Sequence, residues 1–407
     1  MTMGMDSKLA LYGGKPVRKK PLPPMFPGAM MIGEQEKRAV LRILGSRSLF
    51  RYYGPKFQGA VNSFEEEYAR YIGTKHAIGV SSGTGALYVA VAGAGIKPGD
   101  EVILPAYTWI SSAVSVVAHG GVPVVAEVDR SLTMDPKSAE SKITDKTRAI
   151  MPVHMRGVGS RMDKIMSIAK EHGLKVIEDC AQACGGSFHG KKLGSIGDVG
   201  IFSFQLNKIV TAGEGGAVVT NDEAIWQRCL MAQDCAAVVG VGRTKITEEP
   251  IIGLNFRMNE ITGAIMREQL KKLDRILTMM RRNKRRVKDG IKDIEGIEFR
   301  ELPDPEGDTG ICIIFFLESD EKAAKFAEAL NAENIGSSTL YRPNSPDGHI
   351  YLYWRSIVKK TGFNEKNCPK TLDLLGRAVH IDISPQLTKE DTDDIVEAVH
   401  KVADALL

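Results

Sequence analysis

Apolar residues follow two different spacings along the first half of the chain. From residue 34 onward, and again over 64–71, they recur every three or four positions among charged residues, which predicts amphipathic helices. Short continuous apolar runs then alternate with helical stretches over 86–93, 111–119 and 164–172. This alternation predicts an α/β fold in which helices cover both faces of a mostly parallel sheet. The expected strands are 76–80, 101–104, 122–128, 148–153, 174–178, 199–204 and 217–220.

The pattern changes beyond residue 259, where it becomes helical and continues into a basic stretch at 281–288 that we expect to be a solvated helix face. Apolar runs at 296–299 and 311–316, with helical patterns at 322–331 and 389–406, predict a smaller α/β domain. The first 33 residues are rich in Pro, Gly and basic residues and predict an extended arm. We therefore expect an N-terminal arm at 1–33, a large domain at 34–275, and a connecting helix with a small C-terminal domain at 276–407.

The composition narrows the class of protein. A chain of 407 residues is too long for one ordinary hydrophobic core, so two domains are expected. Its 54 basic and 50 acidic residues leave a net charge of +4, which argues against a nucleic-acid surface or a polybasic membrane anchor. No apolar run reaches membrane-spanning length. The six cysteines are scattered without a CxxC pair, which argues against a disulfide scaffold and a zinc site. We expect a cytoplasmic protein that binds small molecules.

Two strands are followed by residues that can bind a flat, phosphorylated ligand. The first strand leads into Ser82-Gly83-Thr84-Gly85. A helix that starts there offers free N–H groups and hydroxyls to a phosphate, at the positive end of its dipole, although the same residues also cap ordinary helices. The second strand leads into Tyr107-Thr108-Trp109. An aromatic ring at this position can stack on a cofactor or belong to the core.

Two further strands lead to an acid and an amine. Strand 174–178 runs into Asp179, and a carboxylate at a buried strand end needs a cationic partner unless it caps a helix. Gln182 follows one turn later. Strand 199–204 carries Ser203 and precedes Lys208 and a glycine-rich turn. Pyridoxal phosphate binds a lysine covalently and takes an acidic partner at its pyridinium nitrogen. In this order the motifs predict a pyridoxal phosphate site with Lys208 as its Schiff-base lysine.

Taken together, the motifs resemble those of the DegT/DnrJ/EryC1/StrS aminotransferases. The resemblance covers nearly all of 34–400 and rests on Ser82-Gly83-Thr84, Tyr107-Thr108-Trp109, Glu178-Asp179-Cys180-Ala181-Gln182, 194–200, Phe202-Ser203-Phe204, Lys208 and 212–216. It implies a fold-type-I enzyme with a mostly parallel seven-stranded large domain and a smaller α/β domain. It also implies a pyridoxal-phosphate-dependent transfer of an amino group from glutamate or glutamine to a keto-sugar. The family works as homodimers, so the active site is expected at the subunit interface.

The resemblance also implies roles for single residues. Lys208 and Asp179 are the expected catalytic residues, and the Lys208 amine must be neutral to move a proton between donor and cofactor carbons. The other implied cofactor contacts are Gly83, Thr84 and Ser203 at the phosphate, Trp109 on the ring, Asp179 at the ring nitrogen, Gln182 near the ring oxygen, and Asn255 reaching the phosphate of the neighbouring subunit.

Two groups of residues indicate different acceptors. Residues 152–155 and 299–308 are similar to the subgroup that forms an 8-amino octulosonate sugar. Tyr107-Thr108-Trp109 and Phe204-Gln205 are instead similar to cyclitol aminotransferases. A free keto-octulosonate, a nucleotide-linked keto-hexose and a cyclitol ketone all stay open as acceptors.

Other functions fit parts of the pattern. A pyridoxal-phosphate-dependent sugar dehydratase on the same fold carries histidine in place of the lysine, so Lys208 argues against it. A Rossmann-type nicotinamide enzyme would need a strand that leads into GxGxxG with an acid downstream. No expected strand of this chain does so, which argues against that class. A non-catalytic binding or regulatory protein on this fold would not need the lysine and the acid. His154, His189 and His380 are candidates for substrate contact that we expect to be structural or exposed.

Overall fold

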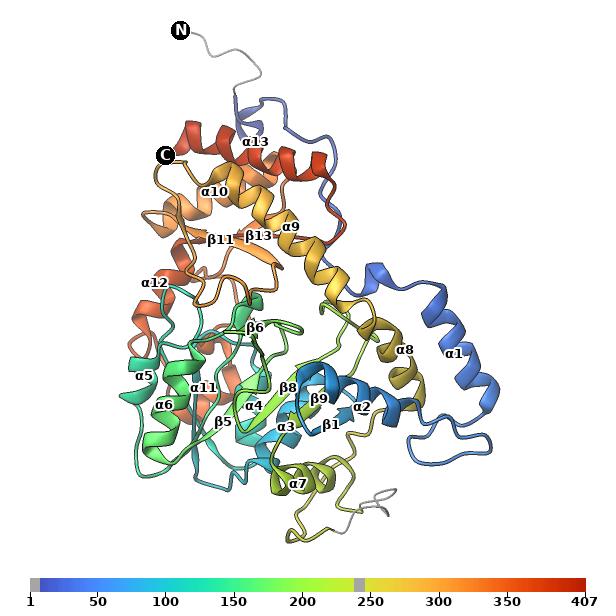
Figure 1. Ribbon diagram of the computed structural model, residues 1–407. Coiled ribbons are helices and arrows are strands. Elements are labelled where there is room, and N and C mark those ends of the chain that lie inside the picture. Colours follow the sequence, from blue (N-terminus) through green and yellow to red (C-terminus); the bar gives the residue numbers. More distant parts are fainter. Residues whose placement is uncertain (1–7, 238–245) are drawn as a thin grey trace.

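Seven strands form one sheet in the lower part of Figure 1. The computed structural model describes residues 8–237 and 246–407. The strand order is β1-β9-β8-β5-β4-β2-β3, and only β9 runs antiparallel to its neighbours. The predicted mostly parallel α/β sheet is confirmed. Its strands are β1 (His76–Val80), β2 (Glu101–Pro105), β3 (Val122–Ala126), β4 (Thr147–Ile150), β5 (Lys175–Asp179), β8 (Val199–Ser203) and β9 (Gly216–Thr220).

Helices cover both faces of this sheet because successive side chains of each strand enter different cores. On β8, Ile201 joins the core that contains α3, α4 and α7, whereas Phe202 joins the core that contains α2 and α6. Burial on both faces explains why the strands have continuous apolar sequences. These helices are α2 (Ala60–Ile72), α3 (Gly83–Gly93), α4 (Ser111–Ala118), α6 (Met162–His172) and α7 (Glu223–Gln233), with a short α5 (Pro136–Glu140) and a hairpin of β6 (Ser187–Phe188) and β7 (Lys191–Lys192).

A second, four-stranded antiparallel sheet lies in the upper part of Figure 1, in the order β10-β11-β13-β12. Its apolar residues pack with α10 (Asp320–Ala332), α13 (Lys389–Leu406) and the end of α9 (Leu273–Ile291). Helix α9 runs from the first sheet to the second and joins the two parts of the chain. The strands are β10 (Glu298–Phe299), β11 (Cys312–Phe316), β12 (Ser337–Thr339) and β13 (Ala378–Asp382).

One segment beyond the second sheet's β12 packs back on the first sheet. It contains η4 (Tyr351–Tyr353) and α11 (Arg355–Thr361), and α12 (Pro369–Arg377) follows it. Tyr351 and Trp354 are fully buried in the core that contains α3 and α4. The backbone N–H of Thr108 donates to the carbonyl oxygen of His349 (2.9 Å). This packing brings His349 to the carboxyl end of β2.

The N-terminal arm runs from α13 to the loop after β8 (Figure 1). Arg18 forms an ion pair with Asp391 near the start of α13 (2.8 Å), and the N–H of Gly28 donates to the carbonyl oxygen of Lys208 (3.2 Å). Two 3-10 turns, η1 (Ala10–Tyr12) and η2 (Ala29–Met31), interrupt the arm, so it is not extended throughout as the composition predicts. Residues 1–7 of the predicted arm lie outside the described residues.

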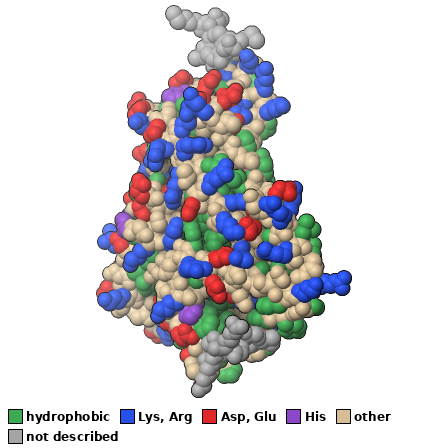
Figure 2. Space-filling view, turned by 45° about the vertical axis from the view of Figure 1, so that its right-hand side comes forward, with side chains coloured by type: hydrophobic (Ala, Val, Ile, Leu, Met, Phe, Trp, Pro, Cys, Tyr) green, Lys and Arg blue, Asp and Glu red, His purple; other side chains and the backbone are tan. Residues whose placement is uncertain are grey.

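The helical stretch predicted beyond residue 259 is divided between α8 (Glu260–Leu270) and α9. Between them, Lys272 Nζ contacts Glu36 Oε1 (2.5 Å) in α1 (Glu34–Ser46). The basic stretch of α9 is partly paired with acids, because Lys284 contacts Asp308 (2.5 Å) and Arg286 contacts Asp393 (2.7 Å). On the face in Figure 2, basic and acidic side chains are interspersed. Among the described helices, none combines the length and apolar character needed to cross a membrane.

Candidate active site

A cavity of about 410 Å³ lies at the carboxyl ends of β1, β5 and β8, and we call it the strand-end cavity. Open α/β sheets bind ligands at this edge. Seven of the eight cofactor residues that the sequence predicts line it, namely Gly83, Thr84, Trp109, Asp179, Gln182, Ser203 and Lys208. Asn255 does not line the cavity of its own chain.

The start of α3 and the end of β8 meet at this cavity. The Ser82 hydroxyl caps the first turn of α3, and the N–H groups of that turn have no acceptor within the helix. A Cβ on Gly83 would lie 2.6 Å from the Cβ of Ser203, so only glycine lets the helix start approach Ser203 this closely. The Thr84 hydroxyl lies 2.9 Å from that of Ser111. Hydroxyls and free N–H groups thus form a cup suited to an anion.

Asp179 supplies a buried acid to the same cavity. It ends β5, and only 4% of its surface is exposed. One carboxylate oxygen accepts from the Ser112 hydroxyl (2.9 Å), and the other accepts from the N–H of Ala181 (3.0 Å). Burial raises the pKa of Asp179, although these hydrogen bonds and Lys208 oppose the rise. Turns follow at 181–182, so the alternative that Asp179 caps a helix is wrong, and a cationic partner would stabilise its charge.

Lys208 lies in the turn beyond the end of β8 rather than on the strand itself. Its N–H donates to the carbonyl oxygen of Gln205 (2.9 Å), and its own carbonyl oxygen accepts from Gly28 (3.2 Å), so contacts on both sides hold its backbone. Burial lowers the pKa of the Lys208 amine; Asp179 opposes this effect, and Arg156 adds to it. The amine is therefore neutral at a lower pH than that of a free lysine, as a proton-transferring base requires.

Trp109 forms a wall of the cavity and is not part of the core, with 49% of its surface exposed. The segment that packs back from the second sheet supports it. A Cβ on Gly348 would lie 2.8 Å from the indole, and the His349 ring lies 5.0 Å from it.

The sequence motifs did not indicate three polar residues that surround Gln182. His349 Nδ1 lies 2.7 Å from Asp347 Oδ1, and its Nε2 lies 3.4 Å from the Gln182 amide nitrogen. Burial alone would raise the pKa of Asp347, but its hydrogen bonds with His349 bring it below the ordinary value. The Gln182 carbonyl accepts from the N–H of Arg156 (3.1 Å). The run Pro346-Asp347-Gly348 signals a turn but does not say which sheet the turn contacts.

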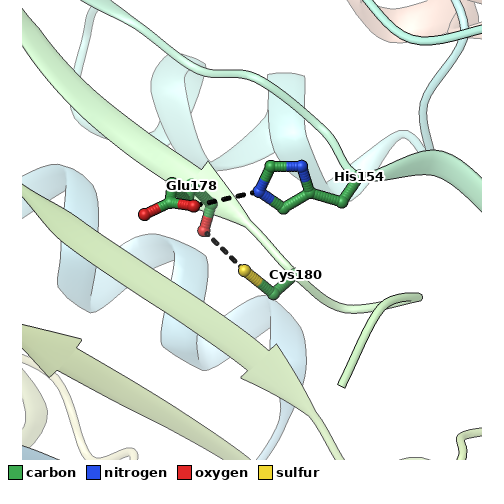
Figure 3. Close-up of side chains that lie close together, drawn as sticks. All are labelled: His154, Glu178 and Cys180. Atoms are coloured by element: carbon green, nitrogen blue, oxygen red, sulfur yellow. Dashed lines mark hydrogen bonds and ion pairs between the residues drawn. The ribbon is translucent and has the colours of Figure 1, made fainter. Parts of the chain in front are cut away.

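His154, Glu178 and Cys180 are buried and lie together (Figure 3), and Glu178 and Cys180 flank Asp179 in the sequence. Such a trio can hold a metal, but here its ligand atoms are in use. The Glu178 carboxylate accepts from the N–H groups of Gly194, Ile196 and Gly197 (2.6–2.9 Å) and lies 3.1 Å from His154 Nε2. His154 Nδ1 accepts from the N–H of Ser160 (3.0 Å), so Nε2 is the donor to Glu178.

The trio therefore anchors the loop at 194–197 to β5 and thereby supports Asp179. His154 is structural, as expected. The other two candidate histidines also lie away from the strand-end cavity: His189 is exposed, and His380 is buried and paired with Asp382 (3.1 Å).

The lining fits pyridoxal phosphate. The anion cup suits its phosphate, the buried acid suits a protonated ring nitrogen, and an amine of lowered pKa lines the same cavity. At Gly83 the start of α3 packs directly against Ser203, so backbone and small side chains form the cup.

A sequence profile of the DegT/DnrJ/EryC1/StrS aminotransferase family matches residues 30–400. GDP-perosamine synthase from Caulobacter vibrioides is 45% identical over 222 residues, which are 54% of this chain and 58% of that protein. An L-glutamine:2-deoxy-scyllo-inosose aminotransferase from Streptoalloteichus tenebrarius is 36% identical over 292 residues, which are 69% of this chain and 67% of that protein. The crystal structure of DesV from S. venezuelae matches with a TM-score of 0.80 at 30% identity, over 95% of this chain and 99% of that one.

Proposed function

The chain belongs to the DegT/DnrJ/EryC1/StrS aminotransferase family, and from this premise we propose that Lys208, Asp179 and the cup at α3 form its cofactor site. The protein is a pyridoxal-phosphate-dependent sugar aminotransferase of fold type I that moves an amino group from an amino donor to a keto-sugar. The observation that carries the site assignment is that a buried acid and an amine of lowered pKa face one cavity that ends in an anion cup.

Each residue of the site has one task in this proposal. When bound, pyridoxal phosphate supplies a ring that accepts the electron pair left when the amine-bearing carbon loses its proton. The first turn of α3, Thr84 and Ser203 hold the phosphate. Asp179 would keep a proton on the ring nitrogen, and Trp109 would cover the ring and exclude water. Lys208 Nζ would take the proton and return it to the neighbouring carbon, a task that needs a neutral amine, and burial lowers the pKa of this amine.

We propose a ketone on a polyhydroxylated ring as the acceptor. One relative is named for a GDP-linked amino sugar, and the other is named for a cyclitol ketone and L-glutamine. The similarity of residues 152–155 and 299–308 to the octulosonate subgroup keeps a free keto-octulosonate as the third candidate. Glutamate and glutamine are both candidate donors.

A panel of acceptors tests this function. The holoenzyme is incubated with glutamate or glutamine and with a GDP-linked 4-keto-hexose, a free keto-octulosonate or an inosose, and the aminated product is detected by mass spectrometry. We expect one class of acceptor to be aminated at the expense of the donor. Loss of water from the sugar without consumption of the donor would indicate a dehydratase, and no reaction with any acceptor would contradict the proposal.

A homodimer with composite sites is the second part of the proposal. Asn255 is exposed outside the cavity of its own chain, and apolar side chains flank it, with Ile252 88% and Leu254 47% exposed. Exposed apolar residues of this kind mark interaction surfaces. We propose that this segment meets a second copy and that Asn255 contacts the phosphate bound by that copy.

Mixed dimers test whether Asn255 acts across the interface. Lys208→Ala and Asn255→Ala subunits are purified separately, unfolded, mixed and refolded together. If Asn255 acts in the partner's site, a mixed dimer contains one site with both residues, and activity returns above that of either variant alone. If mixing restores nothing while the dimer forms, Asn255 does not act across the interface.

The remaining assignments are also proposals. We propose that 34–275 form the cofactor-binding domain and 276–407 the small domain, because the two sheets fall on either side of this boundary. All six cysteines, which lie in the described part of the chain, are unpaired, and this supports a cytoplasmic location.

A further inference from the structure

A second cavity, of about 400 Å³, adjoins the strand-end cavity and shares Gln182, Asn207, Lys208 and His349 with it. We call it the arm cavity, because Met25, Phe26 and Pro27 of the N-terminal arm form one of its walls. Its other lining residues are Arg156, Ile209, Ile311 and Asp382. A molecule that reacts at Lys208 can therefore extend from the first cavity into the second.

Arg156 has unused hydrogen-bonding capacity in the arm cavity. Its Nε donates to the Tyr107 hydroxyl (3.3 Å). Its two terminal nitrogens make no hydrogen bond or ion pair within 8–237 and 246–407, and they are not sealed from the cavity. The planar guanidinium of arginine matches a carboxylate with two parallel hydrogen bonds.

The surrounding structure holds Arg156 in place at a conformational cost. Its backbone is left-handed, with φ 52° and ψ 40°, which is strained for a residue that is not glycine. Arg300 supports this turn from below, because its buried guanidinium donates to the carbonyl oxygens of Ser131 (2.5 Å) and Met155 (2.7 Å). A third, longer bond reaches the carbonyl oxygen of Arg156 (3.4 Å).

The nearby carboxylates already have other partners. Asp382 is paired with His380 (3.1 Å), and Asp347 is paired with His349 (2.7 Å). Neither lies within ion-pair distance of Arg156 in the described chain. Both carboxylates attract Arg156 from a distance, but a partly buried guanidinium without a direct ion pair has lost hydration, and a ligand carboxylate would compensate for this loss.

We propose that Arg156 binds a carboxylate of the molecule that reacts at Lys208 and that it thereby selects acid-bearing substrates. This inference rests on the proposed function, because it assigns one subsite to the same reaction. Two sources can supply the carboxylate: the amino donor, which is glutamate or glutamine, or an acceptor sugar that carries an acid.

Binding of a non-reacting dicarboxylate tests the subsite without turnover. The dissociation constant of glutarate is measured by calorimetry on the holoenzymes of wild type, Arg156→Asn and Arg156→Lys, with neutral glutaramide for comparison. Asparagine tolerates the left-handed backbone, so Arg156→Asn preserves the turn. The matched control is Arg161→Gln, which removes a surface arginine that is paired with Asp129 and Glu301 and lines neither cavity.

We expect Arg156→Asn to weaken glutarate binding about 10- to 100-fold, because two charge-assisted hydrogen bonds are lost. Arg156→Lys should retain part of the affinity for glutarate, and Arg161→Gln should bind glutarate as the wild type does. The dissociation constant of glutaramide should be the same in all variants. An unchanged glutarate constant in a folded, cofactor-loaded Arg156→Asn would overturn the proposal.

Two half-reactions identify the source of the carboxylate. Conversion of the bound cofactor by glutamate is followed by the loss of its long-wavelength absorbance, and the aminated enzyme is then reacted with an acidic keto-octulosonate or a neutral inosose. A slower glutamate step in Arg156→Asn assigns the subsite to the donor. A defect confined to the octulosonate assigns it to the acceptor. A wild-type holoenzyme that aminates no ketone would count against the proposed function, while glutarate binding would still test Arg156.

Discussion

The strand-end cavity and the arm cavity share Lys208 but are built in different ways. The strand-end cavity takes Asp179 and Ser203 directly from the ends of strands in one sheet. The arm cavity combines the N-terminal arm, the turn at Arg156 and Asp382 from the second sheet. A sheet buried on both faces holds its strand ends rigidly, whereas separate segments can change independently. We therefore propose that the first cavity carries the chemistry and that the second selects the substrate.

Replacing Lys208 should have the largest effect and should remove the chemistry from both cavities. We expect Lys208→Ala to slow both half-reactions at least about 10³-fold, because general base catalysis and covalent attachment are both lost. The measurement is single-turnover absorbance of the protein reconstituted with pyridoxal phosphate. Lys192→Ala is the control, because this lysine lies outside both cavities. Substantial turnover by Lys208→Ala would mean that another group moves the proton.

Asp179→Asn should lower the rate by about 100-fold, because a neutral amide does not keep the ring nitrogen protonated. The asparagine side chain can still accept a hydrogen bond through its amide oxygen, so the local structure should be kept. Asp179 does not line the arm cavity, so glutarate binding there should change little. Burial raises the pKa of Asp179, which means that its charged form destabilises the cofactor-free fold above that pKa. The cofactor-free variant should therefore unfold at the same or a higher temperature at pH 7. A clear fall in this temperature would indicate that Asp179 is mainly structural.

Arg300→Lys should affect the arm cavity alone. Lysine cannot reproduce the fork of hydrogen bonds that supports the turn at Arg156, so we expect glutarate binding to weaken about 3- to 10-fold. The absorbance of the bound cofactor and the maximal rate should change little, which distinguishes a positioning residue from a general loss of folding. If the maximal rate fell as much as the affinity for glutarate, the two cavities would not be separable. Arg130→Lys, at an exposed arginine paired with Glu298, is the control.

The pH dependence of cofactor capture should show the smallest effect. Its pH profile should shift in opposite directions when a neighbour of Lys208 is replaced in one cavity or in the other. Only the neutral Lys208 amine attacks the aldehyde of the cofactor, and burial lowers the pKa of this amine. The rate of capture by the cofactor-free protein should therefore level off at a pH below the ordinary lysine pKa of 10.5. Arg156→Asn removes a positive neighbour and should shift the profile to higher pH. Asp179→Asn removes a negative neighbour and should shift it to lower pH. Shifts in the same direction would contradict the assigned surroundings of Lys208.

The difference between the cavities also explains what could be predicted from the sequence. Asp179 and Ser203 could be predicted because each ends an apolar strand, and parallel strands present their carboxyl ends at one edge of the sheet. Gly83 could be predicted because a small residue must stand where a helix start approaches a strand end. These inferences use only local pattern and one rule of topology.

The residues of the arm cavity could not be predicted in this way. His349 reaches the site because its segment packs Tyr351 and Trp354 on the first sheet, which is a tertiary contact without a local signature. Arg156 comes six residues after the end of β4, in a turn whose left-handed backbone at this position the sequence does not favour. The helix at 223–233 and the strand at 378–382 were also not predicted, the latter because antiparallel pairing with β11 supplies its context.

Reduction of the holoenzyme with borohydride tests the central assignment most directly. Borohydride fixes the cofactor to the amine that holds it, and peptide mass mapping then identifies the labelled residue. We predict a single pyridoxyl group on the peptide that contains Lys208 and none on that peptide in Lys208→Ala. A label on any other lysine, or a cofactor that dialyses away after reduction, would contradict the account.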